Sequence, residues 1–167
     1  MRKDNSVIYF SSFNSPIGTI TVYKKNTKLI RIDFNDTSFL TNSDDYNFLE
    51  NKKNCLDIEH ELTRYFKGKL KKFTTSIELE GTAFQKNVWK NLQKIPYGSA
   101  ISYKQLAKNC GSEKAFRACA NANGKNPLPI VIPCHRVIYE NGKMGGYSGG
   151  LHIKKQLLEI EGISLSY

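Results

Sequence analysis

A cysteine, a histidine and an arginine follow one another directly after an apolar run that ends in proline, at Pro133-Cys134-His135-Arg136. The thiolate is the reactive form of cysteine, and a neighbouring imidazole or guanidinium lowers the pKa of a thiol. Pro133 fixes its own φ and donates no backbone hydrogen bond, so Cys134 is expected to begin a turn. A thiol between an apolar strand and two basic side chains is a candidate nucleophile. The pair Cys134-His135 taken alone is more often structural than nucleophilic.

The segments on either side of this pair are more specific. Gly-Lys-Asn-Pro-Leu-Pro precedes it at residues 124–129, and Gly-Gly-Tyr-Ser-Gly-Gly follows it at residues 145–150. Together with Ile-Pro-Cys-His-Arg-Val at residues 132–137, these segments resemble the active-site signature of the O6-alkylguanine-DNA alkyltransferases. The resemblance extends over residues 81–162 and is weaker in the first half of the chain, where it depends on length and on the turn at residues 15–18.

The resemblance implies an α/β (α+β) fold in two domains. Residues 1–80 would form a scaffold domain, a small antiparallel sheet with helices of the ribonuclease H type. Residues 81–167 would form the DNA-binding and alkyl-acceptor domain, a winged-helix-like helical domain with a helix-turn-helix. A step in charge near residue 81 fits this boundary.

The resemblance also implies the activity, which is direct-reversal DNA repair by a methylated-DNA–protein-cysteine methyltransferase. The alkyl group of O6-alkylguanine would pass to Cys134 in a single irreversible reaction, and O4-alkylthymine is left open as a second substrate. The partner would be double-stranded DNA bound through its minor groove by a monomer. No cofactor and no metal are implied, and the location would be the prokaryotic cytoplasm, at the nucleoid.

The same resemblance assigns catalytic roles. His135 would take the thiol proton through a water, and Glu161 would orient the imidazole as the third member of a triad. Tyr103 would press on the DNA backbone and protonate the leaving guanine, because a guanine anion is a poor leaving group. Asn126 would hydrogen-bond the backbone between the recognition helix and the active-site strand. The alternative for Glu161 is an ordinary surface glutamate in the last turn of a helix.

The residues that would contact substrate lie on both sides of the cysteine. Extrusion of a base leaves a gap in the duplex, which Arg117 would fill. Ser148 and the backbone near Tyr147 would hold O6, while the carbonyls of Cys134 and Val137 would read the exocyclic amine. The implied substrate-binding and DNA-binding set is completed by Pro129 and Ala118. Arg136 is expected to be structural rather than catalytic.

Charge and composition agree with a nucleic-acid partner. The net charge is +10 over 167 residues; residues 1–81 carry 13 basic and 11 acidic side chains, and residues 82–167 carry 12 and 4. A basic half around a nucleophile suggests a polyanion, although lysine-rich surfaces often serve only solubility. The four cysteines show no Cys-x-x-Cys spacing, which favours free thiols and disfavours zinc. No apolar run is long enough to span a membrane, and the start does not resemble a signal peptide, so an intracellular protein is expected.

Hydrophobic patterning predicts a β-meander in the first half, with strands near residues 7–10, 20–22 and 29–34. A weakly signalled helix is expected over residues 39–49, and an amphipathic helix should run from an N-cap at Asn54 to Gly68. A strand is predicted over residues 73–79.

In the second half, Thr82 with Gln85 and Ser102 with Gln105 are typical of capping boxes. Ser112 is expected to cap a helix over residues 113–123, giving a helix-turn-helix. Asn-Gly at residues 141–142 predicts a hairpin with a type I′ turn, and a last helix over residues 151–161 should end at Gly162.

Three rival functions are weighed against alkyl transfer. A non-catalytic damage sensor would bind alkylated DNA without transfer, although an intact Cys134 argues against it. A cysteine hydrolase would need an oxyanion hole, which the sequence does not identify. A helix-turn-helix regulator would bind as a dimer at spaced half-sites, and no dimerisation element is evident.

Overall fold

The computed structural model describes residues 6–165 and divides the chain into two compact units, Met1–Leu79 and Glu80–Tyr167. Each unit is described by itself. None of the helices within residues 6–165 has the length and apolar character needed to cross a membrane.

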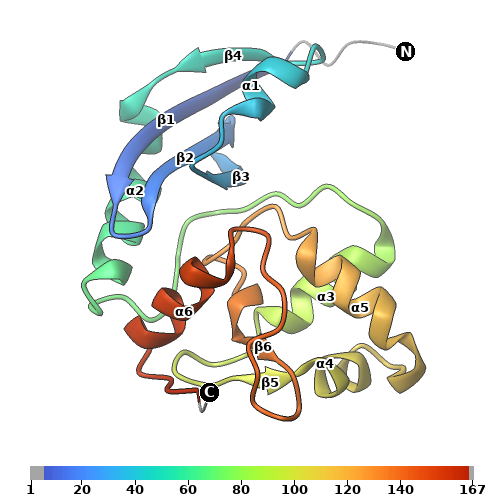
Figure 1. Ribbon diagram of the computed structural model, residues 1–167. Helices are drawn as coiled ribbons and strands as arrows, with labels where there is room; N and C mark the ends of the chain where they lie inside the picture. Colours follow the sequence, from blue (N-terminus) through green and yellow to red (C-terminus); the bar gives the residue numbers. More distant parts are fainter. Residues whose placement is uncertain (1–5, 166–167) are drawn as a thin grey trace. The chain divides into compact units, whose positions relative to one another are not determined.

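The first unit is built on a four-stranded sheet in the order β3-β2-β1-β4 (Figure 1). The meander is present as predicted, because β1 pairs antiparallel with β2 and β2 with β3. Ser15 closes the first turn, since its Oγ donates to the carbonyl oxygen of Gly18 at 2.7 Å. Gly18 itself has φ +106°, a conformation that favours glycine. The strands are β1 (Val7–Ser15), β2 (Gly18–Lys25), β3 (Lys28–Phe34) and β4 (Asn47–Glu50).

Two elements of this unit differ from the prediction. The predicted helix over residues 39–49 is replaced by a five-residue helix, α1 (Ser38–Asn42), and by strand β4. β4 pairs in parallel with β1 at the edge of the sheet. Residues 73–79 do not form a strand; Ile77 makes only an isolated bridge to Leu29. The short apolar run at 47–49 carries too little periodicity to separate helix from edge strand, so pairing with β1 decides its state.

Helix α2 (Lys52–Phe66) lies along one face of the sheet, against β1 and β2 (Figure 1). Its N-cap is Asn51, whose side chain accepts from the backbone N–H of Asn54 at 3.2 Å, so the predicted cap at Asn54 was wrong by one turn. The helix buries its apolar stripe on the sheet, which forms the core of this unit. That core includes Ile8, Ile20, Val22, Leu29, Ile58 and Leu62.

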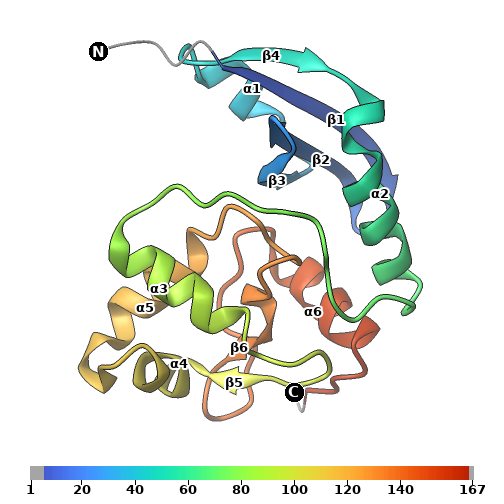
Figure 2. The same cartoon turned by 180° about the vertical axis from the view of Figure 1, so that it is seen from behind.

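The second unit begins with α3 (Ala83–Leu92), which starts at the predicted capping box. Thr82 accepts from the backbone N–H of Gln85, and the Gln85 side chain accepts from that of Thr82. Trp89 is buried as expected, and its indole N–H donates to the carbonyl oxygen of Ala122 at 2.9 Å. This bond fixes α3 against α5, beside which it lies in both views (Figure 2).

The helix-turn-helix is formed by α4 (Tyr103–Asn109) and α5 (Phe116–Gly124), with a single 3-10 turn, η1 (Glu113–Ala115), between them. Ser102 caps α4 by accepting from the N–H of Gln105, but Gln105 bonds Asn109 rather than completing the box. Ser112 makes no side-chain cap, so the predicted helix over 113–123 starts later. The 3-10 turn absorbs the residues that the sequence pattern had assigned to its first turn.

After the cysteine stretch, residues 137–144 do not form the predicted hairpin. β6 (Val137–Ile138) pairs instead with β5 (Ile101–Ser102), in parallel. Of the turn residues, Gly142 has φ +80° while Asn141 keeps a negative φ, so the turn is not type I′. The last helix, α6 (Leu151–Ile160), ends as predicted, with Gly162 at φ +76°.

Candidate active site

Cys134 is the first residue of a 3-10 turn, η2 (Cys134–Arg136), that follows a tightly fixed segment. Asn126 holds this segment on two sides: its Nδ2 donates to the carbonyl oxygen of Ile132 at 2.7 Å, and its Oδ1 accepts from Leu128 N–H at 2.9 Å. Ile130 has φ +74°, a strained conformation for a β-branched residue. The backbone contact expected of Asn126 is therefore present, and it presents Cys134 in one fixed position.

The thiol of Cys134 is buried, with 3% of the residue exposed. Burial raises its pKa above the ordinary value, and hydrogen bonds from Asn126 and Tyr147 and the charge of Lys154 oppose that rise only in part. The expectation that basic neighbours lower this pKa was wrong in its net direction. The side chain therefore rests as a neutral thiol at pH 7 and needs a base when it reacts.

His135, which follows Cys134 in the η2 turn, forms a buried pair with Glu161. The His135 Nε2 lies 2.7 Å from a carboxylate oxygen of Glu161, and both side chains are fully buried. Burial lowers the pKa of His135, although Glu161 opposes that shift, so the ring is neutral at pH 7. A neutral imidazole held by a carboxylate at one nitrogen can accept a proton at the other. The surface-glutamate alternative for Glu161 was therefore wrong.

Arg136 holds the same carboxylate from the other side. Its Nε and Nη2 donate to the two oxygens of Glu161 at 2.7 and 3.0 Å, and its Nη1 donates to Ile95 O at 2.6 Å. Burial alone would raise the pKa of Glu161, but hydrogen bonds from His135 and Arg136 lower it to about 2. The carboxylate thus stays ionised, and Arg136 holds it in place.

Cys134 opens onto a cavity of about 340 Å³, here called the thiol cavity. The structure brings Tyr103, Tyr147 and Ser148 to its wall, as the sequence predicted for a shared site. Burial raises the pKa of Tyr103 to about 12, so the phenol keeps its proton, and its hydroxyl donates to Gly146 O at 3.4 Å. The thiol cavity is also lined by Phe116, Ala120, Asn123, Gly124, Tyr139 and Gly146.

Four of the predicted substrate contacts lie outside the lining of the thiol cavity. Arg117 and Ala118 are exposed on α5, where they are accessible to a partner. Pro129 and Val137 are buried. The carbonyl oxygen of Val137 already accepts a hydrogen bond at 2.6 Å from Lys154 Nζ, which leaves it one lone pair for a substrate.

Lys154 is the main feature that the sequence analysis missed. It is completely buried on α6, and its Nζ donates to the carbonyl oxygens of Val137, Met144 and, at 3.4 Å, Gly146. Burial lowers its pKa to about 8, and Cys134 opposes that shift. Lys154 ties the loop that carries Tyr147 to β6. The available signal was a lysine between Ile153 and Leu157, inside the apolar stripe of a helix.

The described residues, 6–165, contain no cluster of three or more His, Cys, Asp or Glu side chains that could hold a metal ion. The site itself offers a buried thiol, a neutral imidazole fixed by a carboxylate, and a protonated phenol in the cavity wall. Such a set suits attack by sulfur on an electrophile with a proton donor for the leaving group.

Comparison with known proteins identifies both halves of the chain. Residues 83–163 match the DNA-binding domain of 6-O-methylguanine DNA methyltransferase, and residues 8–79 match the ribonuclease-like domain of the same proteins. A methylated-DNA–protein-cysteine methyltransferase of Methanosarcina acetivorans is 42% identical over 155 residues, covering 93% of this chain and 99% of that protein. The methylated-DNA–protein-cysteine methyltransferase of Mycolicibacterium paratuberculosis is 38% identical over 155 residues, which cover 93% of each chain.

Solved structures agree. The crystal structure of Mycobacterium tuberculosis OGT in complex with DNA has a TM-score of 0.85 at 36% identity, covering 92% of this chain and 93% of that one. The O6-methylguanine-DNA methyltransferase of Pyrococcus kodakaraensis has a TM-score of 0.67 at 27% identity, covering 93% and 99%. The expected fold class is thereby confirmed. With matches over both of its units, the chain belongs to the 6-O-methylguanine DNA methyltransferase family.

Proposed function

We propose that this protein repairs DNA by moving the alkyl group of O6-alkylguanine to the sulfur of Cys134, once per molecule. The observation that carries the proposal is a buried thiol that opens onto a cavity, with the His135–Glu161 pair on one side and the protonated phenol of Tyr103 in the cavity wall. Family membership supports the same reaction.

The reaction needs two proton transfers, one from the attacking thiol and one to the leaving guanine. His135 takes the thiol proton through a water, and its charge is then stabilised by Glu161. The sulfur attacks the alkyl carbon, an S–C bond forms, and the bond between that carbon and guanine O6 breaks. Tyr103 donates its proton to the leaving guanine, which would otherwise depart as an anion. A thioether has no comparable leaving group, so the protein ends alkylated.

Substrate recognition is assigned to residues around the thiol cavity. Ser148 and the backbone near Tyr147 hold O6, and the carbonyls of Cys134 and Val137 read the exocyclic amine. Pro129, behind the active-site segment, shapes the site.

DNA binding is assigned to α5. Its exposed Arg117 enters the duplex where the base has left, and the small exposed Ala118 lets the helix approach the minor groove closely. The charge of residues 82–167, 12 basic against 4 acidic side chains, favours the phosphate backbone. Extrusion of the base costs a few kcal/mol, which these contacts offset.

The two units divide the work: residues 1–80 are a scaffold domain and residues 81–167 carry DNA binding and alkyl transfer. Because the substrate is chromosomal DNA, we also propose that the protein acts as a monomer at the nucleoid, in the cytoplasm of a prokaryote.

The decisive experiment is intact-mass measurement and peptide mapping after incubation with a duplex that carries one O6-methylguanine. One added methyl on Cys134, with unmodified guanine left in the DNA and no second turnover, is the expected result. Cys134→Ser should bind the duplex and gain no methyl group. Tight binding by the unchanged protein without transfer would instead indicate a damage sensor, and repeated turnover would indicate a hydrolase.

A further inference from the structure

Two of the four cysteines lie together in the second unit, outside the lining of the thiol cavity. Cys110 is the C-cap of α4 and Cys119 lies within α5, and the two thiols are hydrogen-bonded to each other. Cys110 is partly exposed, whereas the other three cysteines of the chain are buried. The reaction proposed above uses neither Cys110 nor Cys119.

The surroundings of Cys110 favour its thiolate over that of Cys119. Burial raises the pKa of both thiols, that of Cys119 to about 11. At Cys110 the rise is opposed by hydrogen bonds from Cys119 and Asn91 and by the charge of Lys94, whereas at Cys119 the neighbouring Cys110 adds to the rise. Asn91 is itself held in place, because its Nδ2 donates to Asn87 O at 2.9 Å and its Oδ1 accepts from Lys94 Nζ at 3.4 Å. Cys110 is therefore the thiol of the pair that ionises first and that a reagent from solvent reaches.

We propose that Cys110 and Cys119 are a redox-active pair, which closes to a disulfide when the protein meets hydrogen peroxide. The Cys110 sulfur attacks the peroxide, an S–O bond forms, the O–O bond breaks, and one water leaves. The Cys119 sulfur then attacks the sulfenic acid, an S–S bond forms, the S–O bond breaks, and a second water leaves. Two thiols and one hydrogen peroxide thus give one disulfide and two waters, and a thiol reductant reverses the change.

The buried position of Cys119 fits the second step. A sulfenic acid without a neighbouring thiol is oxidised further to the sulfinic and sulfonic acids, which are not reduced back by thiols. Cys119 is already hydrogen-bonded to Cys110, so it can trap the sulfenic acid before a second peroxide arrives. The pair therefore takes up one equivalent of oxidant per molecule in a reversible form.

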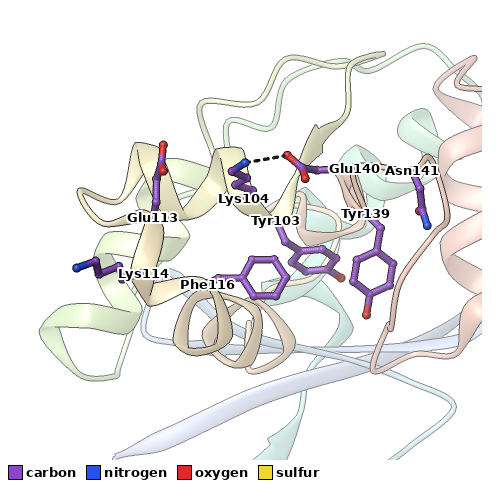
Figure 3. Close-up of a pocket in the computed structure, with 8 residues that line it drawn as sticks. All are labelled: Tyr103, Lys104, Glu113, Lys114, Phe116, Tyr139, Glu140 and Asn141. Atoms are coloured by element: carbon purple, nitrogen blue, oxygen red, sulfur yellow. Dashed lines mark ion pairs between the residues drawn. The ribbon is translucent and has the colours of Figure 1, made fainter.

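The disulfide is compatible with the active site. It would close the loop of residues 110–119, which includes the η1 turn, and Glu113, Lys114 and Phe116 of this loop line a cavity of about 530 Å³ (Figure 3). Neither thiol belongs to the lining of that cavity or of the thiol cavity. Because the two thiols are already hydrogen-bonded, closing the bond requires only a small approach of the sulfurs. We therefore expect the oxidised protein to keep its alkyl-transfer rate.

The test treats the reduced protein with one equivalent of hydrogen peroxide, blocks the remaining thiols with N-ethylmaleimide, and maps tryptic peptides by mass. A lysine or arginine separates each cysteine from the next, so the four cysteines fall in four different peptides. The peptide of residues 109–114 should be linked to that of residues 118–125, with the loss of two hydrogens, while Cys55 and Cys134 carry N-ethylmaleimide. Dithiothreitol should release the link.

Three variants assign the roles. Cys119→Ala removes the trapping thiol, so no link should form and dimedone should label Cys110 as its sulfenic acid. Cys110→Ser should prevent the link and leave the buried Cys119 reduced. Cys55→Ser is the control, because it removes a buried cysteine of the first unit and should form the link as the unchanged protein does.

Oxidation of Cys134 before Cys110, a link that contains Cys55 or Cys134, or a sulfinic acid at Cys110 of the unchanged protein without the link would each overturn the pair. The oxidised protein is finally given a duplex with one O6-methylguanine and should gain one methyl group on Cys134 at the rate of the reduced protein. A lower rate would overturn the compatibility of the disulfide with the active site. Absence of transfer by the reduced protein would refute the proposed function alone, because the peptide map requires no transfer.

Discussion

Glu161→Gln replaces a buried carboxylate by an amide of nearly the same shape. In the unchanged protein the carboxylate accepts from His135, from two nitrogens of Arg136 and, at 3.3 Å, from the backbone N–H of Gly98. An amide has one oxygen, so it cannot accept from all of these donors: either Arg136 Nε, or His135 together with Arg136 Nη2, then faces an N–H₂ group. The buried guanidinium loses its counter-charge, which typically costs about 3–5 kcal/mol of folding free energy.

The lowered pKa of Glu161 also predicts how the stability contributed by its ionised form depends on pH. The pKa of Glu161 falls from 4.5 to about 2 on folding, which corresponds to about 3 kcal/mol. Because the folded pKa is the lower one, this stabilisation is complete above about pH 5 and disappears as the pH falls towards 2. The difference in unfolding free energy between the unchanged protein and Glu161→Gln should therefore be largest at pH 7 and shrink below pH 5.

Glu161→Gln should also slow alkyl transfer, because it changes which nitrogen of His135 carries the proton. If the amide N–H₂ faces His135, the imidazole has to accept at Nε2 and carry its proton on Nδ1, so it can no longer receive the thiol proton there. The transfer rate should fall by about 10²- to 10⁴-fold, the usual contribution of general-base catalysis.

Urea denaturation between pH 3 and 7 and single-turnover transfer rates measure the two effects. Glu159→Gln is the matched control: Glu159 is exposed on α6, two residues before Glu161, and pairs with Lys155 at 3.9 Å, so its loss should change stability by less than about 0.5 kcal/mol. A Glu161→Gln protein with the stability and transfer rate of the Glu159→Gln control would refute this account of the buried carboxylate.

Three further substitutions test other parts of the second unit. Lys154→Met leaves the carbonyl oxygens of Val137 and Met144 without this donor and removes the longer bond to Gly146, so unfolding free energy should fall by about 2–4 kcal/mol and transfer should slow, whereas Lys155→Met, on the exposed side of α6, should change neither. Gly145→Ala places a Cβ 2.9 Å from the Tyr103 ring at φ +71°, so transfer rates measured by mass should fall severalfold; an unchanged rate would mean that the loop yields. Thr82→Ala removes half of a capping box, and thermal denaturation should show about 1 kcal/mol less stability with transfer at the normal rate.

Local signals in the sequence predicted local structure well. The capping box at Thr82, the stop at Gly162 and the turn at Ser15 each depend on hydrogen bonds or dihedral angles within four residues, which the chain specifies without tertiary help. His135 and Glu161 are 26 residues apart in the sequence, so their contact could be predicted only from the family resemblance. The roles proposed for these residues stay predictions.

The features that the sequence did not predict depend on contacts between residues far apart in the chain. β6 pairs with β5, a strand more than 30 residues earlier, and so overrides the turn propensity of Asn141-Gly142. Lys154 drew no prediction, because the three carbonyls around its Nζ belong to residues 8 to 17 positions away in the sequence. The direction of the Cys134 pKa was missed for the same reason, because burial outweighs the basic residues beside it in sequence.

The raised pKa of Cys134 also bears on how long the protein stays usable. Oxidants and adventitious electrophiles attack the thiolate, and a thiol that remains protonated and 3% exposed reacts slowly with them. A repair protein that reacts once is lost when its only acceptor sulfur is oxidised to the sulfinic or sulfonic acid. Burial of Cys134 makes a base necessary for the reaction, and it also protects the thiol from side reactions until the protein binds damaged DNA.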